Sequence, residues 1–342
     1  MKKKVLIAGI GGASLGTELL KCLKLADKYN IFGCDISEFA FGHYQSGFEK
    51  TFLADPNNYV NSIIDICLRA GIEYVIPGAE EPMVLLAESA NSFTNNGIRL
   101  VTNSTEIIKS FSNKTTTFAI LSGLGFRVPL TREISHKKDV YDFDFPAVIK
   151  PARGSGGSFF VFLASNIMEA ELYIDYLFAN GKHCIIQEYI PEDDGEFTVG
   201  VLSLPNFEIV SSIALKRLFN CKLSISSKVN AGIISSGNSQ GLIDDFPEIR
   251  KTAENIASSI RSTGPINVQG RLKDGVFIPF EINPRFSASC FLRAIAGVNE
   301  VDIYLNYLIN RSVEVPKEIS YGYYLRSFSE IFVQKKDVLT ND

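Results

Sequence analysis

The sequence predicts a mixed fold, an α/β domain with a parallel sheet followed by an α+β region with antiparallel sheets. Two observations predict it. Over residues 1–103, short apolar segments alternate with helical patterns across short links, which is typical of a doubly wound parallel sheet. From residue 145 onward, the expected strands come in pairs with short turns, and helices separate the pairs, which indicates antiparallel sheets. A chain of 342 residues is long enough for two or three such lobes.

Residues 1–103 are predicted to form a parallel, doubly wound sheet. The continuous apolar run over residues 4–10 indicates a strand buried on both faces, because a half-exposed strand would alternate polar and apolar residues. The further elements expected along this domain are helix 15–26, strand 29–35, helix 63–70, strand 74–77, helix 83–94 and strand 99–102.

The region after residue 103 is predicted to contain three strand pairs. They are 146–150 with 158–163, 196–204 with 207–215, and 266–272 with 276–283. Capped helices are expected after Asn103 and Asn113, with further helices at 166–179, 247–262 and 288–297 and a strand at 183–190. The tail alternates apolar and polar residues near 323–333, which predicts one more strand.

Composition and charge exclude several classes of protein. Hydrophobic residues make up 46% and charged residues 21%, and the formal net charge of -4 argues against a nucleic-acid-binding surface. No apolar run approaches the ~20 residues that a membrane span needs. The six cysteines are scattered without a Cys-x-x-Cys pair, which argues against a zinc site or a disulfide framework. We therefore expect a cytoplasmic protein with reduced thiols.

A strand followed by a glycine-rich loop is the first motif with chemical meaning. The strand that starts at Pro146 ends on Lys150, and a loop with three glycines follows at 154–157. Glycines let backbone N–H groups approach phosphate oxygens, and a lysine at the strand end adds a positive charge. The motif is not a P-loop, because no Gly-Lys-Ser/Thr occurs and a strand follows. The alternative is a flexible hairpin turn with a solvated lysine.

The second motif is an apolar strand that runs into acidic residues. Residues 185–190 end with Glu188, Tyr189 and Ile190, and a second strand begins at Glu196. Such a segment can offer backbone groups to an adenine edge and carboxylates to ribose hydroxyls. The alternative is a surface turn with solvated acids.

The third motif, residues 267–285, predicts a β-hairpin with a polar face. A three-residue loop over 273–275 would pair Leu272 with Val276, Asn267 with Glu281 and Gln269 with Pro279. With a period of two, one face then carries Gln269, Glu281, Asn283 and Arg285. Acids on an apolar strand are costly unless they bind something, and these oxygens suit Mg²⁺ that bridges phosphates. The alternative is the solvent-facing side of an edge hairpin.

These three motifs, in this order and spacing, resemble the ATP-grasp superfamily, and most closely a half of the carbamoyl phosphate synthase large subunit and the stand-alone carboxylate–amine ligases related to it. The resemblance covers about residues 1–300, and its strongest motif is Glu-Ile-Asn-Pro-Arg-x-Ser-x-Ser over 281–289. It implies a Rossmann-like domain at 1–103, an ATP-grasp domain at 104–311 with a small lid lobe at about 113–190 and a catalytic lobe at about 191–311, and a C-terminal extension at 312–342.

The resemblance also implies roles for individual residues. The ATP contacts that it implies are the phosphate-binding Lys114 and Lys150, the loop of Gly154, Ser155, Gly156 and Gly157, the adenine hinge of Glu188, Tyr189 and Ile190, and the ribose ligand Glu196. The implied metal ligands are Gln269, Glu281 and Asn283, and Arg285 and Lys150 would assist the transfer. Because Gln269 stands where a second carboxylate can occur, the metal would be held with less charge.

The activity that the resemblance implies is that of an ATP-dependent ligase, which activates a carboxylate or bicarbonate as an acyl phosphate for attack by an amine. Its cofactors would be ATP and Mg²⁺, or Mn²⁺ in its place. Its partners would be small-molecule carboxylates and amines, with no nucleic acid and no membrane, and a homodimer is a candidate assembly. Arg217 and Arg293 are candidates for anchoring a substrate carboxylate, and an ordinary surface arginine is the alternative for each.

The N-terminal glycine turn leaves two other functions open. The segment Gly9–Gly16 follows a strand and Asp35 ends the next one, as in a dinucleotide-binding domain, but Ser14 stands where the strict pattern needs glycine. An NAD(P)-dependent oxidoreductase would leave the 267–285 hairpin unexplained. A regulatory protein that binds ATP without turnover is the other alternative. In an ATP-grasp ligase the turn would face the substrate, where Glu80 or Glu81 could receive an amine.

Overall fold

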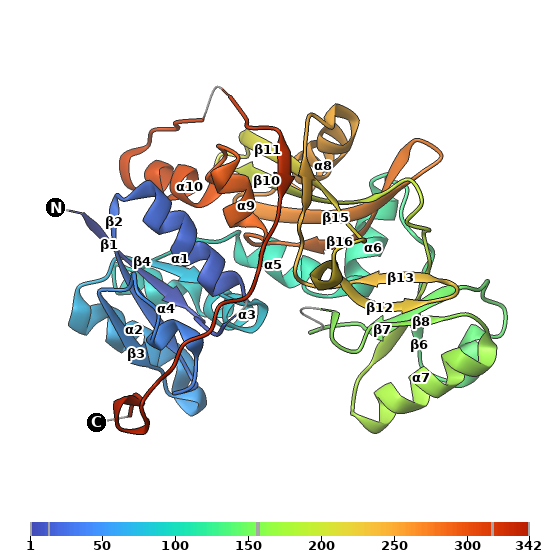
Figure 1. Cartoon of the computed structure of the whole chain (residues 1–342), viewed down its shortest axis with the longest axis horizontal. Coiled ribbons are helices and arrows are strands. Elements are labelled where there is room, and N and C mark those ends of the chain that lie inside the picture. Colours follow the sequence, from blue (N-terminus) through green and yellow to red (C-terminus); the bar gives the residue numbers. More distant parts are fainter. Residues whose placement is uncertain (1, 13, 155–157, 316–317, 341–342) are drawn as a thin grey trace.

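The computed structural model describes residues 2–12, 14–154, 158–315 and 318–340. Within these ranges the strands form sheets of five, four, six and two strands. Figure 1 shows the five-stranded sheet at the N-terminal end, the four-stranded sheet at the opposite end, and the six-stranded sheet between them. No described helix is long and apolar enough to cross a membrane.

The five-stranded sheet is parallel throughout, with the order β3-β2-β1-β4-β5. Alternate residues of β1 enter two different cores, Val5 and Ile7 on the side of α1 and Leu6 and Ala8 on the side of α2. The sheet is therefore buried on both faces, as its apolar sequence predicts. Its elements are β1 (Lys3–Ala8), α1 (Leu15–Ala26), β2 (Tyr29–Asp35), β3 (Lys50–Leu53), α2 (Tyr59–Ala70), β4 (Tyr74–Pro77), α3 (Glu80–Glu88), α4 (Ala90–Asn95) and β5 (Arg99–Leu100).

Several features of this region differ from the sequence prediction, and the strand expected over 99–102 covers only Arg99–Leu100. Strand β3 was not expected, and helix α2 begins at Tyr59 instead of residue 63. The helix expected over 83–94 is two helices, because Ser89 has a non-helical backbone conformation with φ -105° and ψ 18°. The helix and strand bounds at 15–26, 29–35 and 74–77 are confirmed.

The four-stranded sheet has the order β6-β9-β7-β8 and is antiparallel. Its strands are β6 (Thr131–Ile134), β7 (Ala147–Pro151), β8 (Phe162–Ala164) and β9 (Cys184–Glu188), α7 (Ile167–Ala179) packs against it, and α5 (Thr105–Phe111) and α6 (Lys114–Gly123) precede it. The strand expected from residue 158 begins at Phe162, since Ser158 and Phe160 have φ of 65° and 61°, which a strand does not allow.

The six-stranded sheet has the order β16-β15-β10-β11-β14-β17. One face packs on α8, and the other packs on α9 and α10 in a core that also includes α1 of the N-terminal region. Its elements are β10 (Glu196–Ser203), β11 (Ile209–Arg217), β14 (Gly241–Ile243), α8 (Pro247–Ser259), β15 (Pro265–Lys273), β16 (Val276–Asn283), α9 (Cys290–Ile295), α10 (Glu300–Asn310) and β17 (Gly322–Tyr324). A separate hairpin consists of β12 (Ile225–Val229) and β13 (Gly232–Ser235).

The register of the β15–β16 hairpin differs from the prediction. Lys273 pairs with Val276 across a two-residue turn, in which Asp274 and Gly275 both have positive φ, so the turn is shorter than the three residues expected. The register then shifts between Gln269 and Gly270, and Gln269 pairs with Glu281 instead of Pro279. Asn267 pairs with Asn283, and its predicted pairing with Glu281 is wrong.

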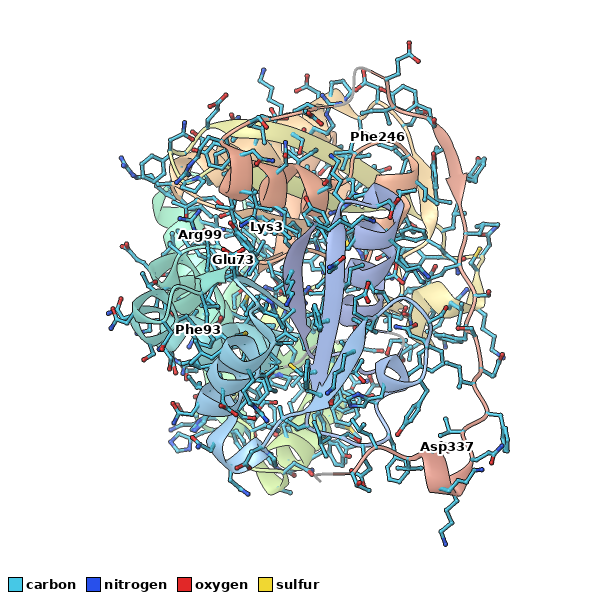
Figure 2. The ribbon with its side chains drawn as sticks, turned by 90° about the vertical axis from the view of Figure 1, so that its left-hand side faces the viewer. Lys3, Glu73, Phe93, Arg99, Phe246 and Asp337 are labelled. Atoms are coloured by element: carbon cyan, nitrogen blue, oxygen red, sulfur yellow. The ribbon has the colours of Figure 1, made fainter. Side chains whose placement is uncertain are left out.

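The C-terminal segment contributes less strand than predicted. Residues 323–333 were expected to form a strand, but β17 covers three residues, Gly322–Tyr324. The chain then passes along one side of the five-stranded sheet toward Asp337 (Figure 2). Leu339 N donates to Tyr44 Oη at 3.2 Å, which ties the end of the segment to the N-terminal region.

Candidate active site

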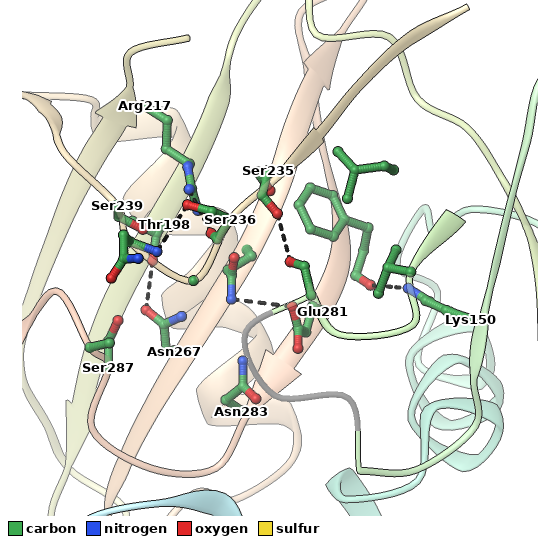
Figure 3. Close-up of a pocket in the computed structure, with 18 of the residues that line it drawn as sticks. Lys150, Thr198, Arg217, Ser235, Ser236, Ser239, Asn267, Glu281, Asn283 and Ser287 are labelled. Atoms are coloured by element: carbon green, nitrogen blue, oxygen red, sulfur yellow. Dashed lines mark hydrogen bonds between the residues drawn. The ribbon is translucent and has the colours of Figure 1, made fainter. Parts of the chain in front are cut away.

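Two rungs of side chains on one face of the six-stranded sheet form the centre of the candidate site (Figure 3). Directly paired residues of antiparallel strands point to the same face, so each rung gathers side chains from β10, β15 and β16. The first rung contains Thr198, Gln269 and Glu281, and the second contains Gly200, Asn267 and Asn283. The prediction that Gln269, Glu281 and Asn283 share one face is therefore confirmed, although their register is not.

These rungs line a cavity of about 420 Å³, which is large enough for a small-molecule ligand. An apolar part of the lining clusters beside Tyr189 and consists of Val148, Val161 and Ile234. The charged residues of the lining are Lys114, Lys150, Arg217, Arg271, Arg285, Glu80, Glu188 and Glu281. Among the described residues, Lys114, Lys150 and Arg285 of this lining form no ion pair, which favours an anionic ligand.

Lys150 is a buried cation in β7. Its Nζ donates to Gln187 Oε1 at 2.7 Å and to the carbonyl of Phe280 at 3.4 Å, and no carboxylate of the described residues lies within ion-pair distance. Burial lowers the pKa of Lys150 to about 7; Lys114 acts in the same direction and Glu281 opposes it. An anion in the cavity would supply the missing counter-charge. The alternative of a solvated lysine is wrong, because the residue is 5% exposed.

The hinge residues expected to receive adenine all line the cavity. Tyr189 and Ile190 are buried, and Glu188 is held at the rim by a hydrogen bond from Leu130 N at 3.2 Å. Lys114, the first residue of α6, lines the cavity as well. The structure therefore brings these four residues and Lys150 around one space.

The glycine loop is described in part. Gly154 has a φ of 63° and lies outside the cavity lining, whereas Ser158 belongs to the lining. The predictions for Ser155, Gly156 and Gly157 fall outside the described residues.

Glu281 is a half-buried carboxylate with one weak hydrogen bond in the described part of the chain. Gln269 Nε2 donates to its Oε2 at 3.3 Å, so Glu281 keeps acceptor capacity toward the cavity. No group of three or more His, Cys, Asp or Glu side chains among the described residues could hold a metal. A metal at this place would therefore bind one carboxylate and the amide oxygens of Gln269 and Asn283, a hard donor set that fits Mg²⁺.

Glu196 does not occupy the position expected of a ribose ligand. It is 0% exposed and lies outside the cavity lining. Its Oε2 accepts from Arg271 Nε at 2.8 Å, and its Oε1 lies 3.4 Å from Arg217 Nε. Glu196 is therefore a buried counter-charge for two arginines, and both of these arginines line the cavity.

Four arginines line the cavity or lie buried behind it, and one of them connects the second motif to a hairpin. Arg271 also donates to the carbonyls of Ile190 and Ile233, both at 2.7 Å, and so links the hinge to the β12–β13 hairpin. Arg217 donates to the carbonyl of Ser236 at 2.7 Å, and Arg293 is fully buried behind the rungs. The alternative of a surface arginine is wrong for both Arg217 and Arg293. Arg285 lines the cavity, as expected.

The N-terminal glycine turn is filled by the chain's own atoms. A Cβ at Gly16 would lie 2.0 Å from the carbonyl oxygen of Gly9, so glycine allows α1 to pack closely on the strand end. Both oxygens of Asp35 accept backbone N–H groups, from Ile10 at 2.8 Å and from Ser37 at 3.1 Å. Gly16 therefore serves packing, and both oxygens of Asp35 are already engaged by the chain's own backbone.

The N-terminal region nevertheless closes one end of the cavity. Ser14, Leu15 and Glu80 line it together with Gly78 and Ala79, whereas Glu81 lies outside the lining. Of the two acids proposed to receive an amine, Glu80 is the one that faces the cavity.

The chain shares its fold with solved structures of the ATP-grasp class. An ADP complex of purK, N5-carboxyaminoimidazole ribonucleotide synthetase, matches with a TM-score of 0.69 and 15% identity, over 93% of this chain and 80% of that one. An L-amino acid ligase from Bacillus licheniformis matches with a TM-score of 0.68 and 16% identity, over 90% and 74%. The biotin carboxylase domain of 2-oxoglutarate carboxylase from Hydrogenobacter thermophilus, with MgADP, ADP and bicarbonate, matches with a TM-score of 0.65 and 16% identity, over 94% and 73%.

A family model also matches part of this chain. Residues 181–331 match the family described as "ATP-grasp in the biosynthetic pathway with Ter operon". No curated protein sequence matches the chain. The resemblance to the ATP-grasp superfamily is therefore confirmed, while the closer likeness to carbamoyl phosphate synthase stays a prediction.

Sequence analysis missed three residues that build the site, namely Gln187, Asn267 and Arg271. Arg271 pairs directly with Glu196 across β10 and β15, so aligning these two strands would have found the buried ion pair. Asn267 lies two residues before Gln269 on the same strand, and its place on the polar face follows from the strand period. Gln187 has no comparable signal, because its role depends on the Lys150 side chain of another strand.

Proposed function

We propose that this chain is an ATP-dependent ligase that activates a carboxylate as an acyl phosphate and passes the acyl group to an amine. One observation carries the proposal: a single cavity joins a buried lysine and an apolar slot at the hinge to a carboxylate–amide cluster and then to the N-terminal region. These are the requirements for holding a nucleotide, a divalent metal and a second substrate in line.

The nucleotide end of the cavity is assigned to ATP. The backbone of Tyr189 and Ile190 would receive the adenine edge, with Val148, Val161 and Ile234 packing on the ring. Lys114 and Lys150 would hold the phosphates, and an anion beside Lys150 restores its protonated form because opposite charge favours ionisation. The ADP held by purK and by the biotin carboxylase domain supports this assignment.

The carboxylate–amide cluster is assigned to Mg²⁺, with Glu281, Asn283 and Gln269 as its ligands. When bound there, the metal neutralises charge on the transferring phosphoryl group, which contributes several kcal/mol to such reactions. Arg285 would neutralise further phosphate charge. An oxygen of the substrate carboxylate attacks the γ-phosphorus as the bond to ADP breaks. The neutral amine then attacks the acyl carbon, inorganic phosphate leaves with that oxygen, and the released phosphate takes up the proton that the nitrogen loses.

The end of the cavity at Ser14, Leu15 and Glu80 is assigned to the amine substrate. A carboxylate at Glu80 favours an ammonium group at this end of the cavity. Small-molecule carboxylates and amines are therefore the proposed substrate classes, and a cytoplasmic site of action is proposed from the reduced cysteines.

A coupled assay of ADP release tests the proposal. Mg-ATP is mixed with each member of a grid of carboxylates and amino acids, and product mass is measured for every active pair. The expected result is ADP release that depends on both substrates, with a product heavier than the carboxylate by the amine less water. ATP binding without ADP release across the grid would instead identify a regulatory protein.

A further inference from the structure

Asn267 is a buried asparagine that faces the cavity from the middle of β15. It is 2% exposed and pairs with Gly200 on one side and Asn283 on the other. It belongs to the cavity lining, and Figure 3 places it between Thr198 and Asn283. Sequence analysis gave this residue no role, and the proposed function does not use it.

The oxygen of the Asn267 carboxamide is already occupied by two donors. Oδ1 accepts from Arg293 Nη2 at 2.7 Å and from the hydroxyl of Thr198 at 2.8 Å. Because a guanidinium donates and never accepts, the atom facing it must be the carboxamide oxygen. Nδ2 therefore points to the other side, and no described residue accepts a hydrogen bond from it.

Arg293 is held in this orientation by a site built around it. It is 0% exposed, and its Nη1 donates to Glu300 Oε2 at 3.3 Å. A Cβ at Gly200 would lie 2.1 Å from Arg293 Nη1 and 2.1 Å from Glu300 Oε1, so glycine at this position makes room for the pair. A buried ion pair whose cation donates to Asn267 fixes which end of the carboxamide faces the cavity.

We propose that Asn267 binds, through Nδ2, the carboxylate oxygen that is phosphorylated and later leaves with phosphate, and that Arg293 and Glu300 are its positioning residues. The inference rests on the proposed function. Asn267 pairs directly with Asn283, one of the proposed metal ligands, and lies two residues, or about 7 Å along β15, from Gln269. A buried N–H donor at that distance faces the oxygen that attacks phosphorus. An amide oxygen presented there would repel that oxygen.

Asn267→Asp tests the donor directly. The change keeps the shape and the acceptor toward Arg293 and Thr198, but it replaces the donor that faces the cavity with an anionic oxygen. Inorganic phosphate is the probe, because it contains the transferred oxygen. It is titrated calorimetrically into protein saturated with Mg-ADP. We expect Asn267→Asp to weaken phosphate binding at least tenfold and Mg-ADP binding by less than about twofold. Asn206→Asp, at an exposed turn, adds the same charge and should change neither.

The positioning role is tested by replacing both members of the ion pair with apolar residues. Replacing Arg293 with methionine and Glu300 with leucine together leaves no unpaired buried charge, so the fold should be retained. The carboxamide is then free to rotate, and we expect phosphate binding to weaken three- to tenfold while Mg-ADP binding is unchanged. Arg293→Lys keeps a donor and a cation and should stay within about threefold of the wild type. A merely structural role would weaken both ligands equally.

The two hypotheses fail in different ways. A wild-type protein that binds neither Mg-ADP nor phosphate would overturn the proposed function. A wild-type protein that binds Mg-ADP but no phosphate, or an Asn267→Asp protein that folds, melts normally and binds phosphate as well as the wild type, would overturn the assignment of Asn267 alone. If Asn267→Asp unfolds, the Arg293→Met and Glu300→Leu pair decides, and unchanged phosphate binding by that variant would overturn the inference.

Discussion

Asp35, beside the N-terminal glycine turn, and Glu281, in the β15–β16 hairpin, both lie at or near the end of a strand. They differ in how many hydrogen bonds their carboxylate oxygens already accept. Both oxygens of Asp35 accept backbone N–H groups at 2.8 and 3.1 Å. Glu281 accepts one weak bond of 3.3 Å from Gln269 among the described residues, and it lines the cavity. The difference separates a packing motif from a binding site: a carboxylate saturated by its own chain has little left to offer a ligand.

Glu281→Gln should break the binding site without breaking the fold. The substitution keeps the volume but removes the charge that would hold the metal, so turnover should fall by roughly 100-fold or more, at ~1.4 kcal/mol per tenfold. The free energy of unfolding should change by no more than about 0.5 kcal/mol, because the carboxylate has few internal partners. ATP turnover and denaturant unfolding of the one variant measure both, with Glu330→Gln on the exposed tail as the control. Normal turnover would show that the metal site is misplaced.

Gly16→Ala should destabilise the fold and leave the binding of Mg-ATP nearly unchanged. The added Cβ would approach the carbonyl oxygen of Gly9 to 2.0 Å, so the helix start must move, at a cost of about 1–3 kcal/mol or more. Mg-ATP affinity of the remaining folded protein should change little, since the turn serves packing. Chemical denaturation and Mg-ATP titration check the two halves of this expectation. Gly123→Ala, at a helical position with nothing within 4 Å, is the matched control and should be neutral or slightly stabilising.

Asp35→Asn should destabilise the N-terminal region by about 1–3 kcal/mol. An amide presents one acceptor where the carboxylate uses two oxygens, so one backbone N–H loses its partner. The denaturant midpoint measures this loss. Turnover per folded molecule should stay within about twofold. A large loss of turnover at unchanged stability would contradict the view that Asp35 is a structural acid.

The low pKa of Lys150 makes both the stability of the protein and its binding of Mg-ATP depend on pH. Its pKa of about 7 lies below the ordinary value of 10.5, so the charged form is disfavoured in the free protein. Without ligand, stability should therefore fall as the pH drops from about 10.5 to about 7 and then level off. Phosphate beside Lys150 favours the charged form, so Mg-ATP binding should take up more protons at pH 8 than at pH 6.

Calorimetric titrations of Mg-ATP in buffers of different ionisation enthalpy measure this uptake. Lys150→Arg, which stays charged at both pH values, should abolish the pH dependence of this proton uptake. Equal uptake at pH 6 and pH 8 in the wild type would place the nucleotide phosphates away from Lys150.

The sequence predicted the parallel sheet and the polar face of the hairpin because both depend on local periodicity. The predicted hairpin register was wrong by two single-residue steps in the same direction, and a total shift of two residues leaves each side chain on its predicted face. The turn is one residue shorter than expected, and the bulge at Phe280 shifts the pairing by one more, which returns Gln269, Glu281 and Asn283 to one face. Turn type and bulge positions depend on packing that periodicity does not reveal.

The role of Glu196 could not be predicted from local sequence. Its counter-charges, Arg217 and Arg271, lie 21 and 75 residues away along the chain, and they meet it because three strands assemble side by side. The same holds for Arg293, which stands among apolar residues in α9 and acts on Asn267 of another element. Roles that depend on such long-range contacts appear once the fold is known.

Thermal unfolding with Mg-ATP and with NAD tests the central claim most directly, because it sets the hairpin cavity against the glycine turn in one protein. A ligand that binds the folded state stabilises it by about 2.7 kcal/mol at 100 times its Kd. We predict a rise in Tm with Mg-ATP, a smaller rise when the metal is chelated, and no rise with NAD. A larger shift with NAD than with Mg-ATP would contradict this claim.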